Sequence, residues 1–372
     1  MQTKSAHICS RRRFLHVVAG GVGAALVGSQ LPGVQPRTAS AASGKLSVYS
    51  ALNESTNNAF VEAFKKSVSG LNVELLPLAA AGELQTRIRT EKDSPKADVF
   101  IGGSSEFHSP LGTEGLLLPY TSPNAAHMAP TYKDADGLWT GWYIGIFGFV
   151  LHPDRFAKDL KDLKPPTRWD DLLMPAWKGH LTMPDPVKTG GGYIFIATQI
   201  FRFAAVSMTA GQATPPTAKQ YAAAEDKAMD YMKKLHANIG QYTGTAPQAI
   251  QLVGQGQFIG APNWSHDILT AKSQGQPIDN LNPQPTGFEV GAVSIIKGGP
   301  NPDGAKAFVD WVLSKEAGAL NVKLSNRLSV LKDVAPAPGA PTLESVQLVP
   351  YDRAWATNNK ARLLKKWQAA IG

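Results

Sequence analysis

Cysteine is almost absent from this sequence. The chain has 372 residues and one cysteine, Cys9, which lies close to the N-terminus. Disulfide frameworks need pairs of cysteines and cysteine-based zinc sites need several thiolates, so the body of the chain has neither. A cysteine nucleophile in the body is excluded on the same ground.

Sequence patterns of common catalytic sites are also missing. No G-x-S-x-G, H-E-x-x-H or S-x-x-K pattern stands in a fitting context. His266 and Asp267 are adjacent, but a catalytic Asp must reach the far ring nitrogen of its His from elsewhere in the chain. We therefore expect that the protein is not an enzyme and that it needs no cofactor and no metal.

The excess of positive charge is small once its distribution is considered. The formal net charge is +8, from 37 basic and 29 acidic residues. Five of the basic residues and none of the acidic ones lie within residues 1–41, so the remaining chain carries 32 basic and 29 acidic residues. That near balance gives no surface for a polyanion, and we expect no nucleic-acid partner.

Residues 1–41 have the order of features of an export signal. An arginine cluster within Ser10–Leu15 precedes a Gly/Ala-rich apolar run at 17–31, and Ala39-Ser40-Ala41 offers small residues to a signal peptidase. The arginine pair followed by Phe14-Leu15 resembles the twin-arginine (Tat) signal. No cysteine for a lipid anchor follows, and no later stretch reaches about 18 apolar residues. We expect a Tat-type signal peptide at 1–41 and a periplasmic protein without a membrane anchor.

Strand and helix patterns alternate along the rest of the chain, which is typical of a parallel sheet covered by helices on both faces. Strands are predicted from β-branched and aromatic runs, and helices from apolar residues at helical spacing. The predicted strands are 45–50, 71–76, 97–101, 142–151, 181–183, 257–262 and 288–296. The predicted helices are 59–68, 82–92, 193–203, 218–239, 247–253, one from Pro302 onward, and 354–370.

Three stretches, taken in order, carry a family resemblance. They are Ala81–Glu83 with Ala97–Phe100, Met183–Pro186 with Thr189–Gly192, and Asn301–Glu316 with Asn326-Arg327. Together with the export signal they resemble periplasmic solute-binding proteins of ABC importers, in the branch that includes ferric-ion and hexose-phosphate binders. The resemblance spans nearly all of the chain after residue 41.

The resemblance implies an α/β, type II periplasmic-binding-protein fold with two lobes. Each lobe would be a mostly parallel sheet flanked by helices, with the ligand in the cleft between the lobes. Open parallel sheets bind ligands beyond the carboxyl ends of their strands, which agrees with this expectation. We place lobe 1 at 42–143 plus 285–325, and lobe 2 at 144–284 plus 326–372.

Loops at predicted strand ends supply the candidates for binding an anion. Glycines let backbone N–H groups approach a ligand, and the start of a helix favours negative charge. Hydroxyl and amide side chains at equivalent loops add donors, although such residues are often only helix caps. The candidates are Thr189, Gly190, Gly191 and Gly192, with Ser104 and Ser105, Ser50 and Asn53, and Thr243.

Acceptor groups for a neutral polar part of the ligand come from His266, Asp267 and Glu289. A carboxylate accepts hydrogen bonds from sugar hydroxyls, and a histidine can donate one. The resemblance implies the same roles, because hexose-phosphate binders hold the sugar ring with a His-Asp pair and a later Glu. Trp142 and Trp264 are candidates for stacking on a ligand face.

The ferric branch of the family makes a different demand. Its members supply an adjacent Tyr-Tyr pair to the hard Fe³⁺ ion, and none of the nine tyrosines here is adjacent to another. The corresponding place carries Trp264-Ser265-His266-Asp267.

The sequence thus predicts a monomeric periplasmic binding protein that captures a small anionic solute and delivers it to an ABC permease in the inner membrane. A phosphorylated sugar or other organophosphate is the favoured ligand. A ferric or other metal ion, a carboxylate or a polyamine stays open as an alternative. A ligand sensor for a receptor kinase would use the same cleft.

Overall fold

The computed structural model describes residues 42–52, 54–78, 81–204 and 216–371. The predicted signal peptide and the candidate Asn53 lie outside these residues. Within them, no helix is both long and apolar enough to cross a membrane.

The first lobe is built on three parallel strands. β1 (Gly44–Ser50) lies between β2 (Leu71–Pro77) and β3 (Val99–Ser104), and β10 (Phe288–Ile296) runs antiparallel to β3. The short β4 (Leu117–Leu118) and β11 (Leu328–Ser329) pair with β10 and β5. The helices of this lobe are α1 (Glu54–Ser67), α2 (Ala81–Thr90), α3 (Ser105–Thr113), α9 (Pro302–Val312) and α10 (Lys315–Ser325), with 3₁₀ turns at Pro123–Ala125 and Pro130–Tyr132.

The second lobe repeats this plan around another parallel group. β6 (Leu181–Pro184) pairs in parallel with β7 (Ile239–Thr243) and β8 (Gly260–Trp264). β9 (Asp279–Leu281) completes the sheet. Its helices are α4 (Pro153–Asp159), α5 (Gly190–Phe203), α6 (Ala218–His236), α7 (Ala246–Gly254), α8 (Ser265–Ser273) and α11 (Arg353–Ile371), with 3₁₀ turns at Trp169–Leu173 and Pro175–Trp177.

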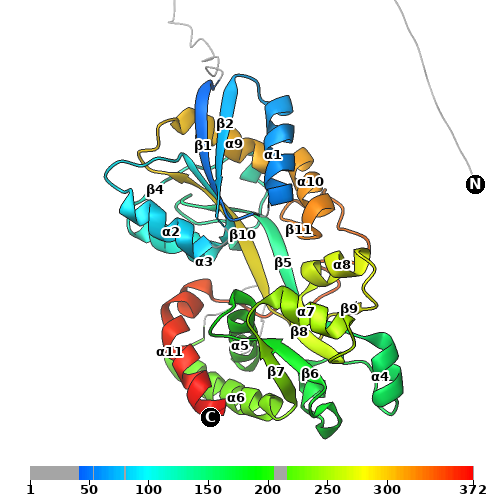
Figure 1. Ribbon diagram of the computed structural model, residues 1–372. Coiled ribbons are helices and arrows are strands. Elements are labelled where there is room, and N and C mark those ends of the chain that lie inside the picture. The colour runs from blue at the N-terminus through cyan, green and yellow to red at the C-terminus, as the bar shows by residue number, and fades with distance from the viewer. Residues whose placement is uncertain (1–41, 53, 79–80, 205–215, 372) are drawn as a thin grey trace, which may run out of the picture. The chain divides into compact units, whose positions relative to one another are not determined.

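One long strand, β5 (Thr140–Leu151), belongs to both sheets. Up to Ile146 it pairs with β10, and from Phe147 it pairs with β8. Figure 1 shows β5 and β10 passing between the two groups of elements. On this pairing, and because β11 pairs with Ile144, we propose lobe boundaries at 146/147, near 285 and after 329. They would replace the sequence-based boundaries at 143/144 and 325/326.

The predicted α/β fold is confirmed, and the element boundaries differ at points that matter for the cleft. α5 begins at Gly190, so the three glycines form its first turn and not a preceding loop. His266 and Asp267 lie in the first turn of α8, and Thr243 is the last residue of β7. Each of these residues is therefore fixed by regular secondary structure.

Aromatic side chains form the centre of each lobe's core. In the first lobe Phe64 contacts Phe308 at a ring separation of 5.0 Å and Trp311 at 5.4 Å, which packs α1 against α9. In the second lobe Phe147 lies edge-on to Trp264 at 4.9 Å. Burying such a side chain contributes about 1.5–3 kcal/mol. Trp142, a candidate for ligand stacking, is 1% exposed and belongs to the core.

A buried histidine of α3 holds the end of β3. His108 stacks on Phe100 at a ring separation of 4.0 Å, and its Nε2 lies 3.0 Å from the carbonyl oxygen of Gly102. That oxygen can only accept, so Nε2 carries the hydrogen and Nδ1 accepts from the Ser294 hydroxyl at 2.6 Å. Burial lowers the pKa of His108 to about 4, against a smaller opposing effect of the Gly102 hydrogen bond.

We expect His108 to make the protein less stable in acid. Its pKa is near 6.5 in the unfolded chain and about 4 in the folded one, so the unfolded state gains the proton first as pH falls. The stability contributed by neutral His108 is complete above pH 6.5, and about 3 kcal/mol of it is lost by pH 4. Urea unfolding of the wild type and of His108→Gln between pH 7.5 and 4 measures this loss. Equal pH dependence in the two proteins would contradict it.

Candidate functional site

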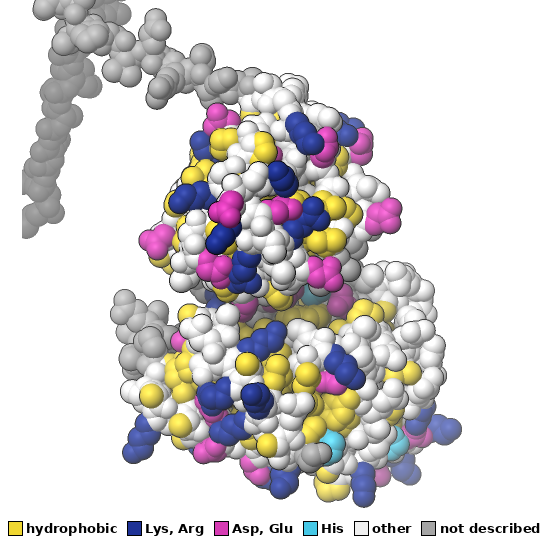
Figure 2. Space-filling view, turned by 60° about the vertical axis from the view of Figure 1, so that its left-hand side comes forward, with side chains coloured by type: hydrophobic (Ala, Val, Ile, Leu, Met, Phe, Trp, Pro, Cys, Tyr) yellow, Lys and Arg dark blue, Asp and Glu magenta, His cyan; other side chains and the backbone are white. Residues whose placement is uncertain are grey.

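A cavity of about 810 Å³ lies between the two lobes. Its wall includes Ser104 and Glu106 from the first lobe and Gly190, Trp264 and His266 from the second. In Figure 2 the surface is hollowed between the upper and lower parts of the molecule, with acidic and histidine side chains visible inside. The volume is within the range of small-molecule sites.

Five helices begin at the wall of this cleft. α2 starts at Ala81, α3 follows Ser104, α5 starts at Gly190, α7 starts at Ala246 and α8 follows Trp264, and all five residues line the cavity. Unpaired N–H groups give the first turn of a helix a partial positive charge. Their convergence makes the cleft suitable for an anionic ligand group.

The first turn of α5 has free N–H groups at the cleft. The Thr189 hydroxyl caps the helix, accepting from the Gly192 N–H at 3.0 Å and donating to the Asp185 carbonyl oxygen at 2.9 Å. Gly190 and Gly191 line the cavity, and their N–H groups have no partner among the described residues. These two N–H groups are thus available to a ligand, whereas the Thr189 hydroxyl is already used.

Close packing explains why glycine occupies the next two positions. A Cβ atom on Gly191 would lie 3.1 Å from Nε1 of Trp264, and one on Gly192 would lie 2.5 Å from the carbonyl oxygen of Pro184. A Cβ on Gly190, in contrast, would meet nothing within 4 Å. Gly190 therefore faces open space in the cleft.

His266 stacks on the ring of Trp264. The two rings stack with a centroid separation of 5.8 Å, and His266 is 3% exposed. Burial, with the positive charge of Arg327 as a second cause, lowers the pKa of His266 well below its ordinary value. Its ring is therefore neutral at pH 7, and neither ring nitrogen has a hydrogen-bond partner among the described residues.

Three carboxylates line the cleft near His266. Asp267 lies 3.5 Å from Nε2 of His266, and Glu106 and Glu289 line the same cavity. Burial raises the pKa of Asp267 and raises that of Glu289 to about 7, while Arg327 opposes both shifts. The negative charges of Glu106 and Asp267 add to the shift of Glu289. This end of the cleft supplies hydrogen-bond acceptors.

Tyr143 and Arg327 lie close to these carboxylates, and the Arg327 guanidinium can only donate hydrogen bonds. The Arg327 guanidinium lies 5.0 Å from the centre of the Tyr143 ring, and both residues line the cavity. Gly291 makes room for the ring, because a Cβ there would lie 1.9 Å from it. Gly145 likewise leaves space for Glu289 and His266, at 2.9 and 3.2 Å from a Cβ.

Eight of the residues predicted from the sequence lie on the wall of this one cavity. They are Ser104, Thr189, Gly190, Gly191, Trp264, His266, Asp267 and Glu289. Residues that sequence analysis did not select also lie there, with Glu106, Tyr143 and Arg327 the most significant because they carry charge or a hydroxyl. Arg327 stands in a motif that carried the resemblance, which was the available signal for it.

Four predicted residues do not line the cavity. Ser50 is buried and donates to Oδ1 of Asn57 at 2.6 Å, and Thr243 is buried and donates to the Thr245 carbonyl oxygen at 2.8 Å. Ser105 is buried beneath the wall, and Gly192 is enclosed by Pro184 and Pro186. These four residues lie at the ends of strands and helices beside the cleft, and none of them lines the cavity.

The described part of the chain contains no group of three or more His, Cys, Asp or Glu side chains arranged to hold a metal ion. The cleft combines unpaired N–H donors at the start of α5 with carboxylate acceptors around His266. Trp264 lies beside both groups.

Comparisons with known proteins agree with this architecture. The family model for bacterial extracellular solute-binding proteins matches residues 59–346. An uncharacterized protein of Haemophilus influenzae is 30% identical over 341 residues, covering 88% of this chain and 90% of that protein.

Two solved structures show what this fold is seen to bind. The periplasmic binding protein AfuA of Actinobacillus pleuropneumoniae, with fructose-6-phosphate bound, is similar with a TM-score of 0.71 and 31% identity over 88% of this chain and 98% of that one. Iron-bound HitA of Pseudomonas aeruginosa has a TM-score of 0.71 at 20% identity, over 88% and 99% of the two chains, which is a likeness of fold alone.

Proposed function

The chain belongs to the bacterial extracellular solute-binding proteins of ABC transporters, and from that premise we propose that it captures a phosphorylated sugar or another small organophosphate. Proteins of this family are periplasmic and deliver small-molecule ligands to ABC permeases. The homologues are binding proteins and not enzymes. The ligand would be held as the lobes close around it, by hinge motion in the crossing strands.

The observation that carries this proposal is the division of the cleft into a donor end and an acceptor end. A phosphate accepts hydrogen bonds only, which suits the N–H groups of Gly190 and Gly191 and the Ser104 hydroxyl. Sugar hydroxyls donate to acceptors, which suits Asp267 and Glu289. The indole of Trp264 lies beside Gly191 and stacks on His266, so the donor and acceptor groups border the same side chain.

A thermal-shift panel tests the ligand class. The panel contains fructose 6-phosphate, 2-aminoethylphosphonate, inorganic phosphate, ferric citrate, spermidine and a simple carboxylate. A ligand at about 100 times its Kd stabilises the folded state by roughly 2.7 kcal/mol, which raises the Tm of a chain of this size by about 5 °C. We expect the organophosphates to give that shift. A shift with iron or spermidine alone would contradict the proposal.

Ionisation of Glu289 should appear in the pH dependence of binding. Its pKa of about 7 in the ligand-free protein leaves part of the population protonated at neutral pH. A ligand hydroxyl that donates to Glu289 favours the ionised form, so the affinity should rise about tenfold from pH 6 to pH 8. Calorimetry with fructose 6-phosphate measures the pH dependence of the affinity in the wild type and in Glu289→Gln. Titration of the ligand phosphate affects both proteins equally and cancels when the two are compared. A slope that persists in Glu289→Gln would exclude this role for Glu289.

Export through the twin-arginine pathway is the other finer part of the proposal. Arg11→Lys combined with Arg12→Lys should leave most of the precursor in the cytoplasm, because the Tat machinery reads the arginine pair. Fractionation followed by immunoblotting measures the distribution. Normal amounts of the variant in the periplasm would instead indicate the general secretory route.

A further inference from the structure

Glu106 is a buried carboxylate that the ligand hypothesis does not use. It lies in the first turn of α3, on the wall of the cleft. Both of its carboxylate oxygens are buried, and neither has a hydrogen-bond partner among the described residues. An ionised carboxylate without a partner is costly to bury, so this arrangement needs a counter-charge in some functional state.

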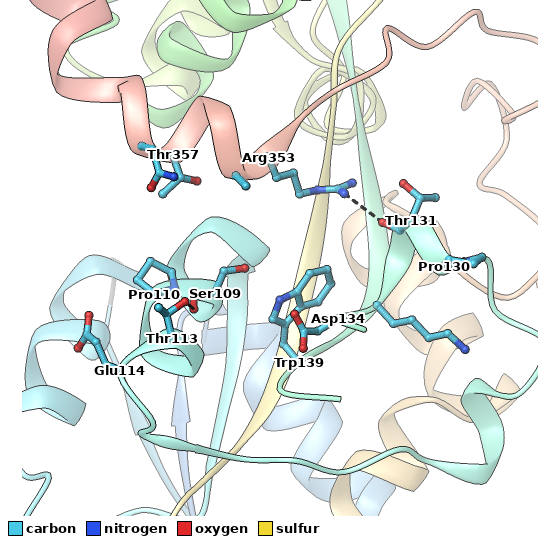
Figure 3. A pocket seen from close by; sticks show the side chains of 13 residues that line it. Ser109, Pro110, Thr113, Glu114, Pro130, Thr131, Asp134, Trp139, Arg353 and Thr357 are labelled. Carbon is cyan, nitrogen blue, oxygen red and sulfur yellow. Dashed lines mark hydrogen bonds between the residues drawn. The ribbon is translucent and has the colours of Figure 1, made fainter. Parts of the chain in front are cut away.

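Two cations of α11 face α3 from the other lobe. Arg353, Thr357 and Lys360 are spaced by four and three residues, which places them on one face of the helix. Figure 3 shows Arg353 and Thr357 opposite Ser109 and Pro110 of α3. A pocket of about 480 Å³ separates the two helices and shares Pro110 and Thr357 with the cleft.

Arg353 is not fully satisfied in this position, and Lys360 is exposed and has no ion pair with a described residue. Arg353 donates from Nη1 to the Thr131 carbonyl oxygen at 3.0 Å, but its Nε and Nη2 are buried with no partner among the described residues. The Lys360 ammonium lies 5.3 Å from the centre of the Tyr193 ring. Desolvation lowers the pKa of both cations, and the Glu106 carboxylate opposes the shift in both.

Glu106 thus lies within electrostatic reach of both cations without pairing with them. No ion pair within 4.0 Å joins it to Arg353 or Lys360 in the described part of the chain. α3 belongs to the first lobe. α11 packs mainly on α6 of the second lobe and also contacts α3 and α5, so a movement of the lobes changes the separation between these charges.

We propose that Glu106 pairs with Lys360, supported by Arg353, only when the lobes close, so that this ion pair across the cleft stabilises the closed state. Closure would bring α11 toward α3 and reduce the pocket between them. Glu106 is then a closure residue and not a contact for the ligand. The inference rests on the lobe closure of the proposed function but not on the identity of the ligand.

Charge-reversal variants that carry a spin label on each lobe test this ion pair, which we call the latch. The only cysteine is Cys9 within residues 1–41, so Lys92→Cys and Lys227→Cys provide the sole labels in the mature chain. Both positions are exposed, one on each lobe. Interlobe distances are measured by double electron–electron resonance, without ligand and with saturating fructose 6-phosphate, and dissociation of that probe is followed by stopped flow.

Lys360→Glu and Glu106→Lys should each shift the distances toward the open state and raise the dissociation rate about tenfold, and the combined variant should restore both readings. Lys365→Glu is the matched control, since Lys365 is exposed on the same helix and forms no ion pair with a described residue. Thermal unfolding of each variant verifies folding.

Two results would overturn the latch. In the first, Glu106→Gln lowers the affinity for fructose 6-phosphate by the same factor whether residue 360 is lysine or glutamine. That result would make Glu106 a direct ligand contact. The other is unchanged distance distributions in all reversal variants, with and without the probe. Absence of fructose 6-phosphate binding in the wild type would instead count against the ligand class, and the ligand-free distances would still report on the latch.

Discussion

Gly190→Asp is expected to abolish binding of the organophosphate without weakening the fold. A Cβ at this position meets nothing within 4 Å, so the new side chain fits without displacing a neighbour. It would stand at the first position of α5, where a carboxylate interacts favourably with the helix N-terminus. The same carboxylate would occupy the anion end of the cleft and repel the phosphate. We expect the affinity for fructose 6-phosphate to fall at least a hundredfold, with Tm unchanged or raised.

Gly190→Asn is the matched control, because asparagine has the shape of aspartate without its charge. Isothermal titration of both variants separates the effect of charge from the effect of bulk. A small loss in Gly190→Asn with a large loss in Gly190→Asp would support an anion at the start of α5. Equal losses would show that bulk alone accounts for them, and full affinity in Gly190→Asp would remove the phosphate from this end of the cleft.

The strands and helices were predictable where local sequence determines them. β1, β2 and β3 alternate with α1 and α2 in the expected order, because short β-branched runs and amphipathic segments are local features. The start of α5 was predicted wrongly, three residues late, because glycine has a poor intrinsic helix propensity. Tertiary packing decides here: no side chain fits at Gly192, and Thr189 provides the cap.

The candidate site was predictable to the extent that strand ends meet at one edge of a sheet. That rule placed Ser104, Gly190 and His266 on one cavity, although they come from different lobes. It also selected Ser50, whose hydroxyl is taken by Asn57 one turn into α1. Which hydroxyls are used internally depends on such contacts and cannot be read from the spacing of residues.

Two charged residues of the cleft could not be placed from the sequence. Glu106 and Arg327 are separated by more than 200 residues. They share the cavity wall because β11, which follows Arg327, pairs with β5, and β5 is joined through β10 to β3, which precedes α3. Nothing in the local sequence distinguishes Glu106 from the many solvated charges of the chain, and the Asn326-Arg327 motif was the available signal for Arg327. Their burial and the pKa of Glu289 follow from the assembled cleft alone.

Asp267 is expected to contribute to affinity while lowering the stability of the ligand-free protein. Burial raises its pKa, so the folded protein disfavours the ionised form that predominates in the unfolded chain at pH 7. Asp267→Asn removes this penalty and should raise the Tm without ligand. A structural residue would show the opposite sign, because its removal would leave neighbours unpaired.

Removal of the Asp267 carboxylate should lower the affinity, and only for ligands that have hydroxyls. Asp267→Ala should weaken the binding of fructose 6-phosphate by about 2–4 kcal/mol, because a ligand donor would be left unpaired in a closed site. Inorganic phosphate, held at Gly190 and Gly191, should bind variant and wild type alike. Asp279→Asn is the control, since Asp279 pairs with Lys272 on the exposed surface of the same lobe. Calorimetry decides: equal losses for both ligands in Asp267→Ala would place the phosphate beside Asp267 and reverse the assignment of the two ends.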